Sequence, residues 1–396
     1  MTGFTRLIVL GLVLTAFAQP ADAMTWARAV ALARAFVSQH NRSAFVQLQD
    51  AATQGDPAAG TVLGVMYQNG KGVTPNLPLA FHWYRLAAHQ GYAPAQTNLG
   101  FMYQQGQGVT PNLPLAVHWY RLAAQQGTAL AQTNLGMMYQ YGKGVTPNLP
   151  LAVHWYRLAA QQGDAVAQFN LGNMYNNGKG VTQNLPLAVH WYRLAAQQGD
   201  AVAQFNLGNM YNNGKGVTQN LPLAVHWYQL AAHQGYAPAQ DNLGIMYAKG
   251  RGVTQNFPTA VHWFQLAAHQ GDAPAQDNLG IMYAKGRGVT QNFPTAVHWF
   301  QLAARQGYKP AIERLRALQQ QMRRTAHAQP VQTPAAAPTP AVAQRASAAP
   351  PIPDRQQSLR NLQRFWTLYF QAAHAHLVDF GAPALVQPVG FAAAHP

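Results

Sequence analysis

The chain has no cysteine, which excludes disulfide bonds, cysteine nucleophiles and cysteine-bound metal sites. Only 9% of its 396 residues are charged, and Glu313 is the sole glutamate. There is no paired carboxylate cluster and no phosphate-binding loop, and none of the four serines is followed by the x-x-Lys of an acylating serine. These absences disfavour catalysis, so we expect neither an enzymatic activity nor a cofactor.

Long hydrophobic runs are absent beyond the N-terminus. The apolar run at 7–18 follows Arg6 and precedes the small-residue site Ala21-Asp22-Ala23. This pattern predicts a signal peptide over 1–23 rather than a membrane anchor, because the run is too short to span a bilayer. No later stretch approaches 18 apolar residues. We therefore expect an exported mature chain without a transmembrane span, either periplasmic or secreted.

The chain does contain a 36-residue repeat, of which seven copies in series occupy 55–306. Each unit opens with one of the following glycines: Gly55, Gly91, Gly127, Gly163, Gly199, Gly235 and Gly271. A fixed period of this length indicates a solenoid, in which each unit buries its apolar face only against its neighbours.

One unit, 91–126, contains two apolar-periodic runs on either side of a turn. Leu99 and Met102 share a face of the first run, which Gly106 ends. Asn112 can cap the second run, where Pro114 is tolerated because the first helical turn has no N–H bond to lose. The sequence therefore predicts an all-α solenoid of helical hairpins.

The segments that flank the repeats resemble capping units. Residues 24–54 keep the register of a second helix but carry Gln47 at the tryptophan position, which predicts an N-terminal helical cap. Residues 307–324 continue the register and end in a basic surface, which predicts a C-terminal cap helix. The arginines of that surface are Arg314, Arg316, Arg323 and Arg324.

The chain changes character after the solenoid. The segment 325–357 is rich in alanine and proline, which predicts an extended linker without a packed core. Residues 358–380 predict an amphipathic helix, and 381–396 a disordered tail. The helix either docks on a partner or membrane surface or folds back onto the end of the solenoid, and the sequence leaves both alternatives open.

The repeat motif A-x-x-x-LG-x-MY-x-x-G-x-GV, followed by A-x-x-WY-x-x-AA-x-QG, resembles the Sel1-like repeat, a relative of the tetratricopeptide repeat. The resemblance implies a right-handed α/α superhelix that serves as an adaptor or scaffold, usually without catalysis. The chain departs from the family pattern where asparagine replaces a frequent acidic residue, as at Asn76. It departs again where histidine replaces a frequently charged residue before each tryptophan, as at His82.

In tetratricopeptide relatives the first helix of each unit lines a concave groove that binds peptides. Transferred by register, the resemblance implies a ligand-binding groove of amphipathic character. Its residues would be Thr97, Phe101, Gln104, Thr133, Met137, Gln140, Phe169, Asn173, Asn176, Phe205, Asn209, Asn212, Asp241, Ile245, Asp277 and Ile281.

Three further residue types recur once per unit. The asparagines of the Asn98 series can clasp a peptide backbone, although a local helix–turn hydrogen bond is the favoured interpretation. The histidines of the His82 series are interpreted as partly exposed side chains beside tryptophan, because ligands on successive helices lie too far apart for one zinc ion. The tryptophans of the Trp83 series are interpreted as core rather than as a sugar-stacking ladder.

The net charge of +15 favours an acidic or anionic partner. Export argues against nucleic acid, and the dispersed basic residues are themselves typical of a solvated surface. We therefore expect an adaptor that binds a protein or peptide in the groove. The alternative is a cell-envelope protein whose basic surface and C-terminal helix hold anionic lipid or cell-wall polymer. A lactam or cell-wall hydrolase is a remote third possibility.

Overall fold

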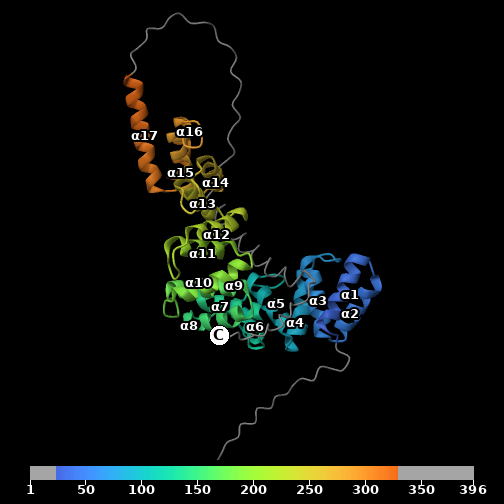
Figure 1. Ribbon diagram of the computed structural model, residues 1–396. Helices are drawn as coiled ribbons and strands as arrows, with labels where there is room; N and C mark the ends of the chain where they lie inside the picture. Colours follow the sequence, from blue (N-terminus) through green and yellow to red (C-terminus); the bar gives the residue numbers. More distant parts are fainter. Residues whose placement is uncertain (1–23, 329–396) are drawn as a thin grey trace, which may run out of the picture. The chain divides into compact units, whose positions relative to one another are not determined.

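The computed structural model describes residues 24–328, and within them the chain forms 17 α-helices and no strand (Figure 1). The prediction of an all-helical chain is confirmed. The helices are α1 (Trp26–Gln39), α2 (Arg42–Thr53), α3 (Pro57–Asn69), α4 (Leu77–His89), α5 (Ala93–Gln105), α6 (Leu113–Gln125), α7 (Ala129–Tyr141), α8 (Leu149–Gln161), α9 (Ala165–Asn177), α10 (Leu185–Gln197), α11 (Ala201–Asn213), α12 (Leu221–His233), α13 (Ala237–Lys249), α14 (Phe257–His269), α15 (Ala273–Lys285), α16 (Phe293–Arg305) and α17 (Lys309–Ala328).

The described chain falls into two compact units, one ending at Asn112 and the other beginning at Leu113. The first unit holds α1–α5, where α3 and α4 pair as a hairpin. The second holds α6–α17, where α7/α8, α9/α10, α11/α12, α13/α14 and α15/α16 form successive hairpins, each packed on the next. The predicted signal peptide, the linker from residue 329, the amphipathic helix and the tail lie outside the described residues.

Local sequence sets the ends of each helix. Asp164 is the N-cap of α9, and its Oδ1 accepts from the Ala167 N–H at 2.8 Å. Gly178 is the C-cap of the same helix and has a φ of 63°. Helix α10 begins at Asn184, whose Oδ1 accepts from the Leu187 N–H at 3.0 Å. These contacts supply partners for backbone groups that an isolated helix leaves unpaired. The cap predicted for Asn112 is seen at the equivalent asparagines, which cap α4, α8, α10, α12, α14 and α16.

Within a hairpin, a glycine of the first helix packs against an aromatic ring of the second. A Cβ placed on Gly172 would lie 2.7 Å from the ring of Tyr192, which is closer than real atoms approach. Tyr192, Leu171 and Met174 are buried around this contact. The close approach of the two backbones therefore requires the absence of a side chain at Gly172.

A buried glutamine fastens each hairpin to the preceding one. The Gln204 side chain is 4% exposed, and its Nε2 donates to the Ala196 carbonyl at the end of α10 at 3.0 Å. Its Oε1 accepts from Gln234 Nε2, in the loop after α12, at 2.8 Å. Glutamines 168, 240 and 276 make the same pair of bonds. The NH₂ end of the buried amide is thus bonded to the preceding hairpin, and its oxygen to the end of its own hairpin.

Helices occupy both segments that flank the repeats, and the last of them runs past its predicted end. Helices α1 and α2 occupy the predicted N-terminal cap, where Phe36 stacks on Phe45 with ring centroids 4.5 Å apart. Helix α17 packs against α16 and buries Ala311 and Leu318. It continues to Ala328, four residues past the predicted end at 324, because 325–328 contain no proline or glycine that would stop a helix.

Candidate functional site

The predicted groove residues all lie on first helices of the hairpins, from α5 to α15, and none of them is exposed. Eleven are half-buried: Gln104, Met137, Gln140, Phe169, Asn173, Asn176, Phe205, Asn209, Asn212, Ile245 and Ile281. Five are buried: Thr97, Phe101, Thr133, Asp241 and Asp277. We call those that belong to α7, α9, α11, α13 and α15 the first-helix face. Half-buried amides, aromatics and aliphatic side chains give this face its amphipathic character.

Tyrosines of the second helices fix several amides of the first-helix face. The Tyr192 hydroxyl donates to Asn173 Oδ1 at 2.7 Å, and the Tyr228 hydroxyl to Asn209 Oδ1 at 2.7 Å. Burial raises the pKa of Tyr228 to about 12, so its hydroxyl stays protonated and remains a donor. These amide oxygens are therefore bound within their own hairpin, which orients each NH₂ group.

The recurring asparagines connect consecutive repeats. Asn242 Nδ2 donates to Asn209 Oδ1 at 3.2 Å, and Asn278 Nδ2 donates to Asp241 Oδ1 at 2.8 Å. In both cases the acceptor belongs to the preceding hairpin. The favoured interpretation, a local helix–turn hydrogen bond, is wrong for these two residues, because stacking brings the preceding first helix within reach of their side chains.

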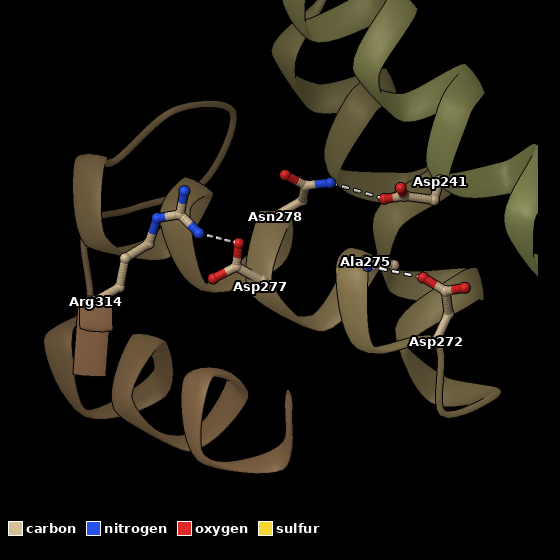
Figure 2. Close-up of polar contacts among 6 residues, drawn as sticks. All are labelled: Asp241, Asp272, Ala275, Asp277, Asn278 and Arg314. Atoms are coloured by element: carbon tan, nitrogen blue, oxygen red, sulfur yellow. Dashed lines mark hydrogen bonds and ion pairs between the residues drawn. The ribbon is translucent and has the colours of Figure 1, made fainter. Parts of the chain in front are cut away.

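The C-terminal end of the first-helix face carries carboxyl groups instead of amides (Figure 2). Asp241 and Asp277 occupy equivalent positions on α13 and α15 and are 6% and 3% exposed. The pKa of Asp241 is raised to about 7, mainly by burial. The hydrogen bond from Asn278 lowers this pKa, whereas the charges of Asp272 and Asp277 raise it further. Asp272 caps α15 through the Ala275 N–H at 2.8 Å.

Asp277 differs from Asp241 because it has a cationic partner, Arg314 of α17 (Figure 2). Burial raises the pKa of Asp277, and the hydrogen bond and charge of Arg314 oppose that effect. Arg314 was predicted to lie in a basic surface, and its ion pair with Asp277 was not predicted. The 36-residue register could have indicated this ion pair. Arg314 stands one period after Asn278, and Asp277 stands one period after Asp241, the acceptor of Asn278.

A row of cations follows the first helices of the second unit. Each stands directly after the glycine that ends its helix, and we call these residues the loop cations: Lys143, Lys179, Lys215, Arg251 and Arg287. Arg251 Nη2 donates to Asn212 Oδ1, on the first helix of the preceding hairpin, at 3.3 Å. The loop cations therefore border the first-helix face.

The recurring histidines are exposed, and each packs edge-on against the tryptophan that follows it. The ring centroids of the seven pairs are 4.9–5.4 Å apart. The prediction that they pack beside tryptophan is confirmed. Trp119 and Trp263 are buried, and the other five repeat tryptophans are half-buried. Within residues 24–328 no three histidine or carboxylate side chains are grouped to hold a metal ion, and no helix is both long and apolar enough to cross a membrane.

Comparison with known proteins agrees with this architecture. The family model described as Sel1 repeat matches seven consecutive segments: 61–92, 93–128, 129–164, 165–200, 201–236, 237–272 and 273–308. No curated protein matches the sequence.

Two solved structures are similar to the chain over most of its length. A protective antigen present in uropathogenic Escherichia coli strains, which displays an SLR fold, is 38% identical with a TM-score of 0.66 over 69% of this chain. The match covers 59% of the antigen, so the chain spans about three fifths of that protein. A Sel1 repeat protein from Oxalobacter formigenes is 36% identical with a TM-score of 0.56, over 73% of this chain and 85% of that one.

Proposed function

Because the chain belongs to the Sel1 repeat family and is a repeat scaffold, we propose that it binds a protein or peptide partner along the first-helix face and catalyses no reaction. The observation that carries the proposal is the way in which the repeats differ from one another. A leucine and a methionine of each first helix stay constant and buried, whereas the chemistry of the first-helix face changes along the chain.

The constant framework includes a leucine and a methionine of each first helix, such as Leu171 and Met174, which are 0% and 2% exposed. The variable positions change together. Thr133, Met137 and Gln140 give way to Phe, Asn and Asn in the next two repeats, and then to Asp, Ile and Ala in the last two. Stacking requires only the constant residues. Variation of the first-helix face along a duplicated array supports recognition of an extended ligand that meets different chemistry in successive repeats.

A capture experiment tests this proposal. The chain from Met24 onward is used as bait for envelope and secreted proteins, and each captured protein is identified, purified and titrated. The test variant is M137A/F169A/F205A, which removes half-buried apolar side chains from the first-helix face. The control variant is L187A/L230A/L266A, which removes exposed leucines from the second helices.

We expect the test variant to weaken binding of the captured protein at least tenfold, which is about 1.4 kcal/mol, and the control to leave it unchanged. Circular dichroism confirms that both variants remain helical. Equal binding by the two variants would refute the assignment of the first-helix face. Capture that disappears with added salt in every variant would point instead to an electrostatic surface.

Export is a separate part of the proposal, supported by the predicted signal peptide over 1–23. We expect the native protein to be recovered from the periplasm or the medium with Met24 as its first residue. Fractionation followed by N-terminal sequencing measures this. Recovery from the cytoplasm with residues 1–23 still attached would refute it.

A further inference from the structure

The loop cations border a part of the first-helix face that carries amides and no carboxylate. Lys179 and Lys215 are exposed, and Arg251 is half-buried. They follow α9, α11 and α13, so they recur once per repeat along the second unit. From the sequence alone such residues are typical of a dispersed, solvated surface. The contacts of this loop position in the structure indicate a more specific arrangement.

Two repeats show where the side chain at this loop position lies. Arg251 Nη2 reaches Asn212 Oδ1, near the end of the preceding first helix, at 3.3 Å. In the first unit, glutamine occupies the same position, and Gln107 Oε1 accepts from Gln68 Nε2 of the preceding first helix at 2.9 Å. By the same register Lys179 and Gln140, and Lys215 and Asn176, occupy the positions equivalent to Arg251 and Asn212.

Cations and amides therefore alternate along one edge of the first-helix face. We call this set the amide–cation strip, and its residues are Gln140, Asn176, Asn212, Lys179, Lys215 and Arg251. The aspartates of α9 and α11 do not neutralise it, and Asp241 of α13 is buried and accepts from Asn278. Asp164 and Asp200 cap the opposite, N-terminal ends of α9 and α11 and bond to their own helices. A helix of 13 residues separates its two ends by roughly 20 Å.

We propose that the amide–cation strip binds an extended acidic peptide segment of the partner, with a carboxylate at every third residue. Asn242 of α13 reaches Asn209 of α11 at 3.2 Å, so successive first helices lie side by side. Neighbouring helices are roughly 10 Å apart, and we expect successive loop cations to recur at about that interval. An extended chain advances about 3.3 Å per residue, and three residues therefore match one repeat. This inference rests on the proposed function and specifies the chemistry of the partner.

A peptide fits the strip better than a phosphate polymer does, because the same face also carries apolar groups. Met137, Phe169 and Phe205 are half-buried next to the amides. The side chains of a peptide can cover these groups, whereas a phosphate chain has no apolar atoms to do so. The amide NH₂ groups of Asn176 and Asn212 can in addition donate to peptide carbonyls.

The repeats themselves supply matched variants. The test variant is K179Q/K215Q/R251Q, in which glutamine is the residue that repeat two carries at this position as Gln107. The control variant is R121Q/R157Q/R193Q, which removes three cations from second helices. Glutamine is tolerated there as well, because Gln229 bonds to Tyr247 just as Arg193 bonds to Tyr211. Each variant therefore loses three positive charges.

Binding is measured by fluorescence anisotropy with three synthetic peptides of equal length. The first has four glutamates at every third position, the second has the same composition with its glutamates adjacent, and the third has glutamine in place of glutamate. We expect the spaced peptide to bind about tenfold more tightly than either of the others. We expect the test variant to lose that advantage and the control variant to keep it.

Several results would overturn the inference. The first is that the test and control variants lose affinity for the spaced peptide equally. The second is that the spaced and adjacent peptides bind equally well, and the third is that the spaced peptide does not bind. A fourth is that a polyphosphate chain of matched charge binds more tightly than the spaced peptide and loses that binding in the test variant alone. That result would assign the strip to a phosphate polymer instead. If capture still depends on Met137, Phe169 and Phe205 while the spaced peptide fails, the proposed function stands and only the acidic partner is wrong.

Discussion

Replacing Asp241 with asparagine should stabilise the protein at about pH 8 and leave its stability at about pH 4 unchanged. The Asp241 carboxyl is 6% exposed, it accepts a hydrogen bond from Asn278, and no described cation pairs with it. Its pKa is raised from 3.8 to about 7, mainly by burial. Because the pKa is higher in the folded chain, folding favours the protonated form.

The sign of the pH dependence follows from this difference. Below the unfolded pKa the carboxyl is protonated in both states and has no effect on stability. Between the two values the unfolded chain gives up a proton that the folded chain keeps, so stability falls as pH rises. Above about 7 both states are ionised and the full penalty is present. At 1.36 kcal/mol for each pKa unit, that penalty is about 4 kcal/mol at most.

Asparagine retains the Oδ1 that accepts from Asn278 Nδ2 and removes the charge. We therefore expect the D241N variant to gain about 2–4 kcal/mol over the wild type at about pH 8. Urea unfolding followed by circular dichroism, at several pH values between these limits, measures the difference. The transition that includes α13–α17 is the relevant one, because repeat proteins do not always unfold as one unit.

The control is D50N, which changes an exposed aspartate on α2. We expect its pH profile to follow that of the wild type. The reasoning is refuted if D241N gains as much stability at about pH 4 as at about pH 8, or if its profile is indistinguishable from that of D50N.

Three further substitutions test the repeat framework by chemical denaturation. G172A should destabilise by about 1–3 kcal/mol, because a Cβ there meets the Tyr192 ring at 2.7 Å, and stabilisation by the better helix former would contradict the packing. N184A should cost about 1 kcal/mol through loss of the α10 cap, whereas an unchanged midpoint would show that water replaces it. Q204A should cost about 1–3 kcal/mol, since it removes the bond to the preceding hairpin and the bond to Gln234, and a cost below 0.5 kcal/mol, roughly that of a surface change, would refute the buried role.

The helices and their ends could be predicted because the relevant signals are local. Gly178 ends α9 through its own left-handed backbone, and Asn184 caps α10 through an N–H three residues later. The 36-residue period could be read directly from the sequence, and seven matched segments confirm it. Such features depend only on residues within one or two helical turns.

The side-chain contacts of the candidate site were less predictable. The groove residues could be assigned to first helices from the register, but their burial could not, because it depends on the tyrosines of the second helices and on the next repeat. The favoured interpretation of Asn242 and Asn278 was wrong for the same reason. Their acceptors stand 33 and 37 residues earlier in the chain.

By itself the sequence determined the all-helical hairpins, their number in the repeat array and their caps, since periodicity and turn chemistry act over short distances. Only the tertiary structure decided which polar groups meet across repeats. It joined Gln204 to the preceding hairpin and to the end of its own hairpin, brought Arg314 to Asp277 and placed Arg251 against Asn212. The last two pairs form because stacking superimposes equivalent helices, so that residues roughly one period apart along the chain lie within hydrogen-bond distance.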